Sequence, residues 1–155
     1  MNPAAEAGRR HGFLIAALFA GPLAGSAIHV ALRLGALDVP RPNIELVSVL
    51  GLLLLAPVLE ELVFRGGIQE FFDRTAFGRV SLAGAVSVGN VSTSILFAAA
   101  HFMLNPSWIA ASVFLPSLVF GRLKQLYPSL LPSMLVHAWY NACFLAAAGT
   151  CVSFC

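Results

Sequence analysis

The sequence predicts an all-α fold: a polytopic transmembrane helix bundle with about five spans and one amphipathic helix. Hydrophobic residues make up 59% of the 155 residues and charged residues only 10%, whereas a soluble domain has about 25% charged residues. The apolar residues gather in stretches of the length that crosses a bilayer as a helix, about 20 residues. Neither an internal repeat nor a linker interrupts these stretches, so we expect a single domain over residues 1–155.

The first expected span covers residues 12–34. Arg9 and Arg10 ahead of it resemble the start of a signal peptide. The apolar stretch continues to Leu34 without a small-residue cleavage site, however, which favours a retained helix. Turn-forming residues separate the later spans. The second span begins near Ile44, and the third, fourth and fifth cover residues 81–104, 107–123 and 130–149.

Residues 66–79 alternate aromatic and charged side chains, a pattern typical of a helix that lies in the membrane interface. The positive residues favour an N-terminus in the cytoplasm, because seven of the nine Lys and Arg residues then lie on the inner side. The formal net charge is only +2, and no basic patch with interleaved aromatic residues occurs. These features argue against a nucleic-acid partner and for the lipid bilayer as a partner.

The stretch Glu60-Glu61-x-x-x-Arg65 ends an apolar run that starts at Val47. Glu61 and Arg65 are four residues apart, so they share a helical face and can pair. Glu60 lies about 100° further round the helix, where Arg65 does not directly cover it. An ionisable side chain at membrane depth costs about 2.5–3.5 kcal/mol on insertion scales, which makes it a functional-site candidate. The alternatives are a structural ion pair at a helix end, or charges that already lie among the headgroups.

Two other expected spans carry polar residues. Phe97 and His101 share a face of the third span, and His137 and Asn141 share a face of the fifth. Taken alone, a histidine in an apolar helix is more often a core residue, and an asparagine often joins two helices. Polar groups in lipid must satisfy one another, however, so we expect Glu60 and the two histidines to meet with Asn141 in one cavity.

Such a cavity has a specific chemistry. A carboxylate beside an imidazole can activate water by taking its proton, and a histidine with an amide donor can stabilise the resulting oxyanion. The set therefore predicts a hydrolase without a nucleophilic serine or cysteine, and no cofactor. Two alternatives remain. Zinc could bind to one Glu and two His residues, although no H-E-x-x-H motif is present. A proton relay in a transporter is disfavoured by the lack of inverted repeats.

The predicted spans leave one geometric conflict. Glu60 lies sixteen residues after Ile44, whereas His101 lies only a few residues before the turn at Pro106. At about 1.5 Å per residue these positions differ in depth. Either the second span begins nearer Gly51, or the third continues past Pro106.

The three motifs in this order resemble those of the CAAX-protease and bacteriocin-processing family (CPBP, or Abi) of glutamic intramembrane endopeptidases. They are Glu60-Glu61-x-x-x-Arg65, Phe97-x-x-x-His101 and His137-x-x-x-Asn141, and the resemblance covers residues 56–145. It implies that Glu60 activates water together with His101. It also implies that His137 and Asn141 form the oxyanion site, with support from Glu61, Arg65 and Phe97.

The chain is shorter than the prenyl-protein endopeptidases of this family, which have about eight spans. Short bacterial relatives, such as the myxosortase-like enzymes, are thought to process C-terminal sorting tails that contain a transmembrane segment. The resemblance therefore implies a membrane-anchored protein or peptide as substrate, and the bacterial inner membrane as location. A non-enzymatic bacteriocin-immunity protein, which would bind a peptide without cleaving it, is the alternative function.

Overall fold

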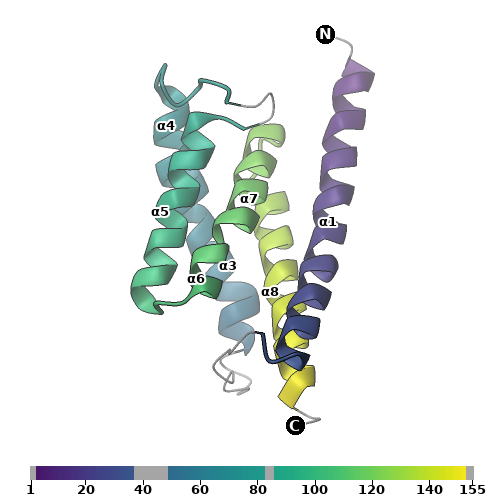
Figure 1. Ribbon diagram of the computed structural model, residues 1–155. Helices are drawn as coiled ribbons and strands as arrows, with labels where there is room; N and C mark the ends of the chain where they lie inside the picture. The colour runs from purple at the N-terminus through teal and green to yellow at the C-terminus, as the bar shows by residue number, and fades with distance from the viewer. Residues whose placement is uncertain (1–2, 37–48, 83–85, 153–155) are drawn as a thin grey trace. The chain divides into compact units, whose positions relative to one another are not determined.

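A computed structural model describes residues 3–36, 49–82 and 86–152, with side chains up to residue 148 (Figure 1). The described residues confirm the all-α class, because their only β feature is an isolated bridge between Ser81 and Ser87. The helices are α1 (Pro3–Arg33), η1 (Gly51–Leu55), α3 (Ala56–Glu61), η2 (Leu62–Gln69), α4 (Glu70–Arg74), α5 (Val88–Leu104), α6 (Trp108–Ser112), α7 (Phe114–Leu126) and α8 (Leu131–Val152).

The chain divides into two compact units, and the first extends to Pro57 and resumes at Leu135. In this unit α1 lies against α8 at glycines that leave room for close approach. A Cβ at Gly21 would lie 2.9 Å from the Tyr140 ring. The Tyr140 hydroxyl donates to the Ala17 carbonyl at 2.9 Å. These contacts fix the two helices of the first unit side by side.

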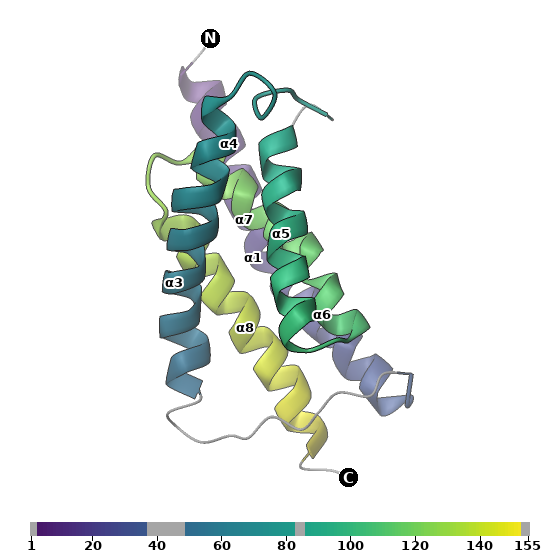
Figure 2. The same cartoon turned by 90° about the vertical axis from the view of Figure 1, so that its left-hand side faces the viewer.

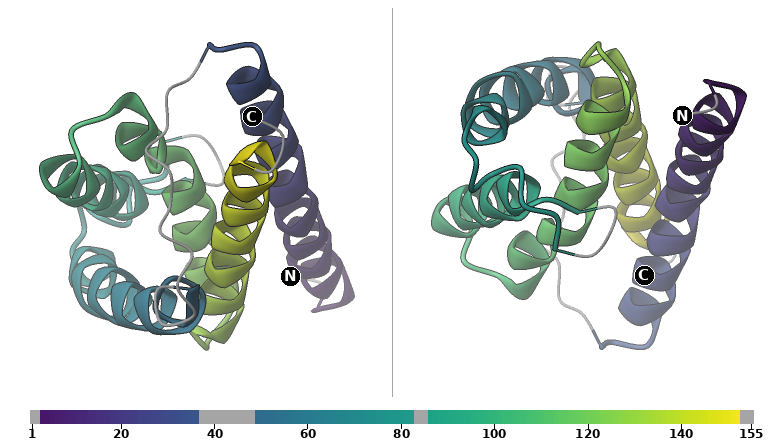
Figure 3. Two further views of the ribbon diagram at one scale, coloured as in Figure 1. Left: turned by 90° about the horizontal axis from the view of Figure 1, so that it is seen from below. Right: turned by 90° about the horizontal axis from the view of Figure 1, so that it is seen from above.

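The second unit, Val58–Met134, holds two of the three motifs. Its chain rises through η2 and α4, descends through α5 and rises again through α6 and α7 (Figure 2). The helices η2, α5 and α7 are mutual neighbours, as views from above and below also show (Figure 3). Phe97, Phe120 and Leu123 form the fully buried apolar part of this unit.

Helical turns wider than α-turns flank the two acids. In η1 the Ala56 N–H donates to the Gly51 carbonyl, five residues earlier. Pro57 follows directly and has no N–H to continue the α-helical pattern. Glu61, Arg65 and Gln69 follow one another at intervals of four residues from the end of α3 through η2, and each is completely buried.

Each expected span has a helical counterpart, but several predicted boundaries were wrong. The helix α1 begins at Pro3 rather than near residue 12. The third helix begins at Val88 rather than at residue 81, because the Ser87 side chain caps it by accepting from the Asn90 N–H. The amphipathic helix ends at Arg74. The predicted start of the second span near Ile44 lies outside the described residues.

The interior of the second unit is rich in polar side chains, and many large apolar side chains lie on its surface. Polar residues with at most 1% exposure are Glu61, Arg65, Gln69, Asn90, Thr93, Ser94, Ser117 and Ser133. Leu59, Ile95, Met103 and Leu104 are each at least half exposed. Large exposed apolar surfaces mark contact with a membrane or a partner protein.

By length and hydropathy, two helical segments within the described residues could cross a membrane. They are Ala4–Arg33, near the N-terminus, and Trp108–Leu126, while Val88–Leu104 is a shorter apolar helix. The number of five spans stays a prediction.

An ion pair joins α4 to α7 beyond the motif residues. Lys124 Nζ donates to Glu70 Oε2 at 2.6 Å, and this hydrogen bond, with the Lys124 charge, lowers the pKa of the Glu70 carboxyl. A lowered pKa in the fold means that the pair stabilises the fold above the pKa of Glu70 in the unfolded chain. The stabilisation is lost as pH falls through the lowered pKa.

We therefore expect Lys124→Met to reduce the free energy of unfolding near neutral pH by less than about 1 kcal/mol, because solvent partly screens the pair. The difference from wild type should become smaller in acid, because protonation of Glu70 removes its attraction to Lys124. Thermal unfolding of detergent-solubilised protein at about pH 7 and about pH 3 measures this. An equal difference at both pH values would contradict the assignment.

Candidate active site

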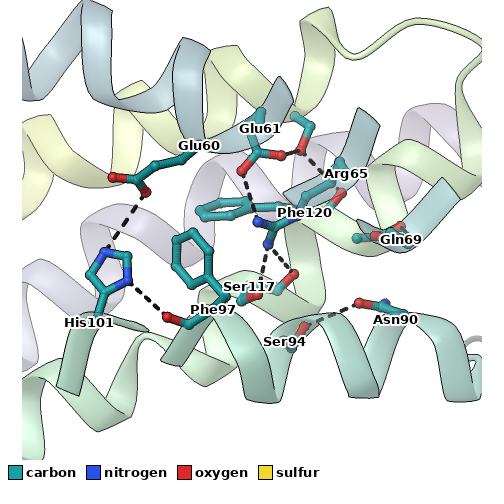
Figure 4. A network of polar contacts seen from close by, with 12 residues as sticks. Glu60, Glu61, Arg65, Gln69, Asn90, Ser94, Phe97, His101, Ser117 and Phe120 are labelled. Atoms are coloured by element: carbon teal, nitrogen blue, oxygen red, sulfur yellow. Dashed lines mark hydrogen bonds and ion pairs between the residues drawn. The ribbon is translucent and has the colours of Figure 1, made fainter. Parts of the chain in front are cut away.

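Glu60 on α3 and His101 on α5 meet in the second unit. His101 Nε2 lies 3.8 Å from Glu60 Oε2, and about a third of each side chain is exposed (Figure 4). The helix α5 ends at Leu104, where Asn105 turns to an extended conformation. The third helix therefore does not continue past Pro106, which excludes one of the two solutions to the depth conflict. The carboxylate and the imidazole nevertheless lie together, as the sequence predicted.

His101 is oriented by its own helix. Its Nδ1 lies 3.0 Å from the Phe97 carbonyl oxygen. A carbonyl can only accept a hydrogen bond, so Nδ1 carries a proton in this contact. In the neutral ring the unprotonated nitrogen is then Nε2, which is the atom that faces Glu60. The distance to Glu60 is longer than a direct hydrogen bond of about 2.7–3.2 Å.

Phe97 connects this pair to the buried charges. Its ring packs against the His101 ring at a tilt of 37° with centroids 4.4 Å apart, and the Arg65 guanidinium carbon lies 4.7 Å from its centroid. Phe64 contacts the same ring edge-on at 4.9 Å. Only 1% of Phe97 is exposed, so the ring has little freedom to turn. Phe97 therefore holds the plane of the imidazole.

Glu61 and Arg65 form the ion pair that their spacing predicts. Arg65 Nη1 lies 3.2 Å from Glu61 Oε1, and neither side chain has any exposed surface. Arg65 Nη2 donates to the Ser117 carbonyl at 2.9 Å and to its hydroxyl at 2.7 Å. The Ser133 hydroxyl donates to Glu61 Oε2 at 2.5 Å.

Neither serine was predicted from the sequence to take part in the site. The signal for Ser133 was its position four residues before His137, in the surroundings of the third motif. Ser117 has no comparable signal, because it lies outside all three motifs.

His137 and Asn141 lie on α8, in the first unit. They are four residues apart and share a helical face, and His137 is buried. Asn141 Nδ2 donates to the Leu52 carbonyl at 2.9 Å. The structure thus brings together Glu60 and His101 with their three supporting residues in the second unit. The place of the α8 residues in the site stays a prediction.

Residues 3–36, 49–82 and 86–152 contain no group of three or more His, Cys, Asp or Glu side chains that could hold a metal ion. Glu60 and His101 are two side chains of these types that lie close together. The expected absence of a cofactor remains a prediction.

The buried ion pair should contribute strongly to the free energy of unfolding. Arg65→Met leaves the buried Glu61 carboxylate without this counter-charge, and removal of one partner of a buried pair costs about 3–5 kcal/mol. Adding Glu61→Gln should recover part of the loss, because no uncompensated charge then remains buried. Unfolding of the detergent-solubilised variants measures both effects.

Arg74→Met is the matched control, since 77% of that side chain is exposed and its pair with Glu70 should contribute less than about 1 kcal/mol. Equal stability of Arg65→Met and Arg74→Met would contradict the importance of the buried pair.

A protein-family model described as Type II CAAX prenyl endopeptidase Rce1-like matches residues 42–143, well over half of the chain. No curated protein and no solved structure matches the chain significantly. The family match confirms the resemblance drawn from the three motifs, while the myxosortase-like subtype stays a prediction. Together with the apolar helices, it indicates an integral membrane protein from a family that acts on membrane-anchored proteins. The chain belongs to the Rce1-like family of type II CAAX prenyl endopeptidases, which are proteases.

Proposed function

We propose that this protein is a glutamic-type intramembrane endopeptidase that hydrolyses a peptide bond near the C-terminal membrane tail of a substrate protein. The observation that carries the proposal is the Glu60–His101 pair, with a separation of 3.8 Å and partial exposure of both side chains. The contact of His101 Nδ1 with the Phe97 carbonyl turns the other ring nitrogen toward the carboxylate. A base and its partner are thus aimed at the same point.

In the proposed reaction, water binds beside the line that joins Glu60 Oε2 and His101 Nε2. Two atoms 3.8 Å apart can each lie about 2.8 Å from one water oxygen. The Glu60 carboxylate takes a proton from this water while the water oxygen attacks the scissile carbonyl carbon. The C–N bond then breaks, and the proton passes to the leaving amine. The products are a new carboxylate and a new amine.

We assign the oxyanion of this reaction to His137 and Asn141, on the basis of the third motif. An imidazole N–H and an amide N–H are suitable donors to a developing negative charge. Glu61 and Arg65 neutralise each other and support the helix from which Glu60 projects. In this mechanism no metal ion takes part, and water is activated by the carboxylate and the imidazole alone.

The proposed substrate is a membrane-anchored protein with a sorting tail at its C-terminus. The proposed location is the bacterial inner membrane, with the N-terminus of the protease in the cytoplasm, as the distribution of positive residues favours.

The general base can be tested by one substitution. Glu60→Gln keeps the size of the side chain but removes its basicity, so cleavage should fall by at least about 10²-fold, in the range that general bases contribute. Mass spectrometry of C-terminal peptides should find shortened tails in cells with wild-type protein and uncut tails with the variant, at matched membrane levels.

Glu70→Gln is the control, because it makes the same change at a carboxylate outside the site and should leave cleavage intact. Full cleavage by Glu60→Gln would contradict the mechanism. If wild type and Glu60→Gln showed identical tails and shared a cellular phenotype, a peptide-binding immunity protein would replace the protease as the better assignment.

Because the proposed mechanism needs no metal, treatment of the purified protein with a chelator should leave cleavage of the identified tail unchanged. Loss of cleavage that returns on addition of zinc would show that the same residues work through a metal ion.

A further inference from the structure

The helix α7 contains none of the three motifs, yet its backbone carbonyls accept side-chain hydrogen bonds from two other helices, η2 and α5. The donors and acceptors are Arg65 to Ser117, Asn90 to Leu118 and Gln69 to Gly121. A carbonyl oxygen has two lone pairs, so it can accept such a bond besides its helical one. In the second unit, α7 is therefore the element to which the motif-bearing helices are bonded.

Two of the donor side chains, Gln69 and Asn90, pack against Gly121. Gln69 Nε2 donates to the Gly121 carbonyl, and Asn90 Nδ2 donates to the Leu118 carbonyl, each at 3.0 Å. A Cβ at Gly121 would lie 2.0 Å from Asn90 Oδ1 and 2.9 Å from Gln69 Oε1. Asn90 Oδ1 also accepts from the Ser94 hydroxyl at 3.3 Å, which holds the amide in place. Any side chain at position 121 would displace these amides.

We propose that Gln69, Asn90 and Gly121, here called the amide clamp, position Glu60 and His101 for catalysis. Gln69 belongs to the same helical run as Glu60, and Asn90 to the same helix as His101. Along these helices the clamp lies about 13 Å from Glu60 and about 16 Å from His101. It fixes both helices to α7 at a point remote from the reacting atoms, so its residues are positioning residues. This inference rests on the proposed function.

The clamp prevents the helices from sliding along one another, rather than holding them together. Arg65 and Gln69 are four residues apart, as are their acceptors Ser117 and Gly121, so η2 and α7 run parallel in matched register. A slide by one residue, about 1.5 Å, would break both contacts. A buried amide that loses its partner in such a slide costs about 1–3 kcal/mol. Directional bonds thus select one register.

The test measures the distance between the two reacting positions without a substrate. All native cysteines are replaced by serine, and Glu60→Cys and His101→Cys are joined with a short bifunctional thiol reagent in membranes. Cross-linking is scored on the monodisperse monomer after size-exclusion chromatography, so that unfolded protein does not contribute. In this background Gly121→Ala should lower the cross-linking yield several-fold.

Three further variants sharpen the test. Gly67→Ala is the matched control on η2, because its Cβ would meet only the Leu62 carbonyl at 3.8 Å, and it should leave the yield unchanged. Asn90→Ala removes the donor to the Leu118 carbonyl and should lower the yield as well. Gln69→Met keeps the approximate side-chain volume without the amide and should lower the yield even if Gly121→Ala does not accumulate.

Unchanged cross-linking in the folded fraction of both Gly121→Ala and Gln69→Met would overturn the clamp, even if less folded protein were recovered. The same chain with native Glu60 and His101 separates this failure from that of the proposed function. Tail cleavage that is retained by Glu60→Gln would overturn the protease mechanism. Cleavage that Glu60→Gln abolishes but both clamp variants retain at the wild-type rate would overturn only the clamp.

Discussion

The burial of Arg65 is the constraint on which the second unit depends. A guanidinium with no exposed surface needs compensation on every side, because an unpaired charge in apolar surroundings is very costly. The compensation comes from the Glu61 carboxylate, the two oxygens of Ser117, and the rings of Phe97 and Phe120. These groups belong to α5, to α7 and to the end of α3, while Arg65 itself lies in η2. One buried cation thus draws all the principal helices of the unit together.

The charge of Arg65 and the chemistry of Glu60 are linked through an aromatic ring. Phe97 has the guanidinium on one side and the His101 imidazole as a further stacking partner. Phe97 thus links the ion pair to the proposed catalytic pair, Glu60 and His101. Because Glu61 takes the counter-charge role, the adjacent Glu60 remains partly exposed and keeps its contact with His101. The two neighbouring acids thereby have different partners, as their helical positions suggested.

Local spacing was sufficient to predict the all-α class and the Glu61–Arg65 pair, because both depend on residues within a few turns of each other. The meeting of Glu60 with His101 followed from the need of polar groups in lipid to satisfy one another. Local patterns could not predict Gln69, Asn90 or Ser117, whose contacts join residues 28 or 52 positions apart and are set by packing. The predicted helix boundary was wrong where a single capping residue sets the start of the helix, as Ser87 does for α5.

The bond between His101 and the Phe97 carbonyl has a consequence for how the site can vary. The acceptor is a backbone atom of the same helix, so it is present whatever amino acid stands at position 97. Substitution of Phe97 can remove the aromatic stack but not this hydrogen bond. The direction of the imidazole is therefore inherited from helical geometry, while the steadiness of its plane depends on side-chain identity. The first property would survive transplantation of the helix into another scaffold, whereas the second would have to be rebuilt from new neighbours.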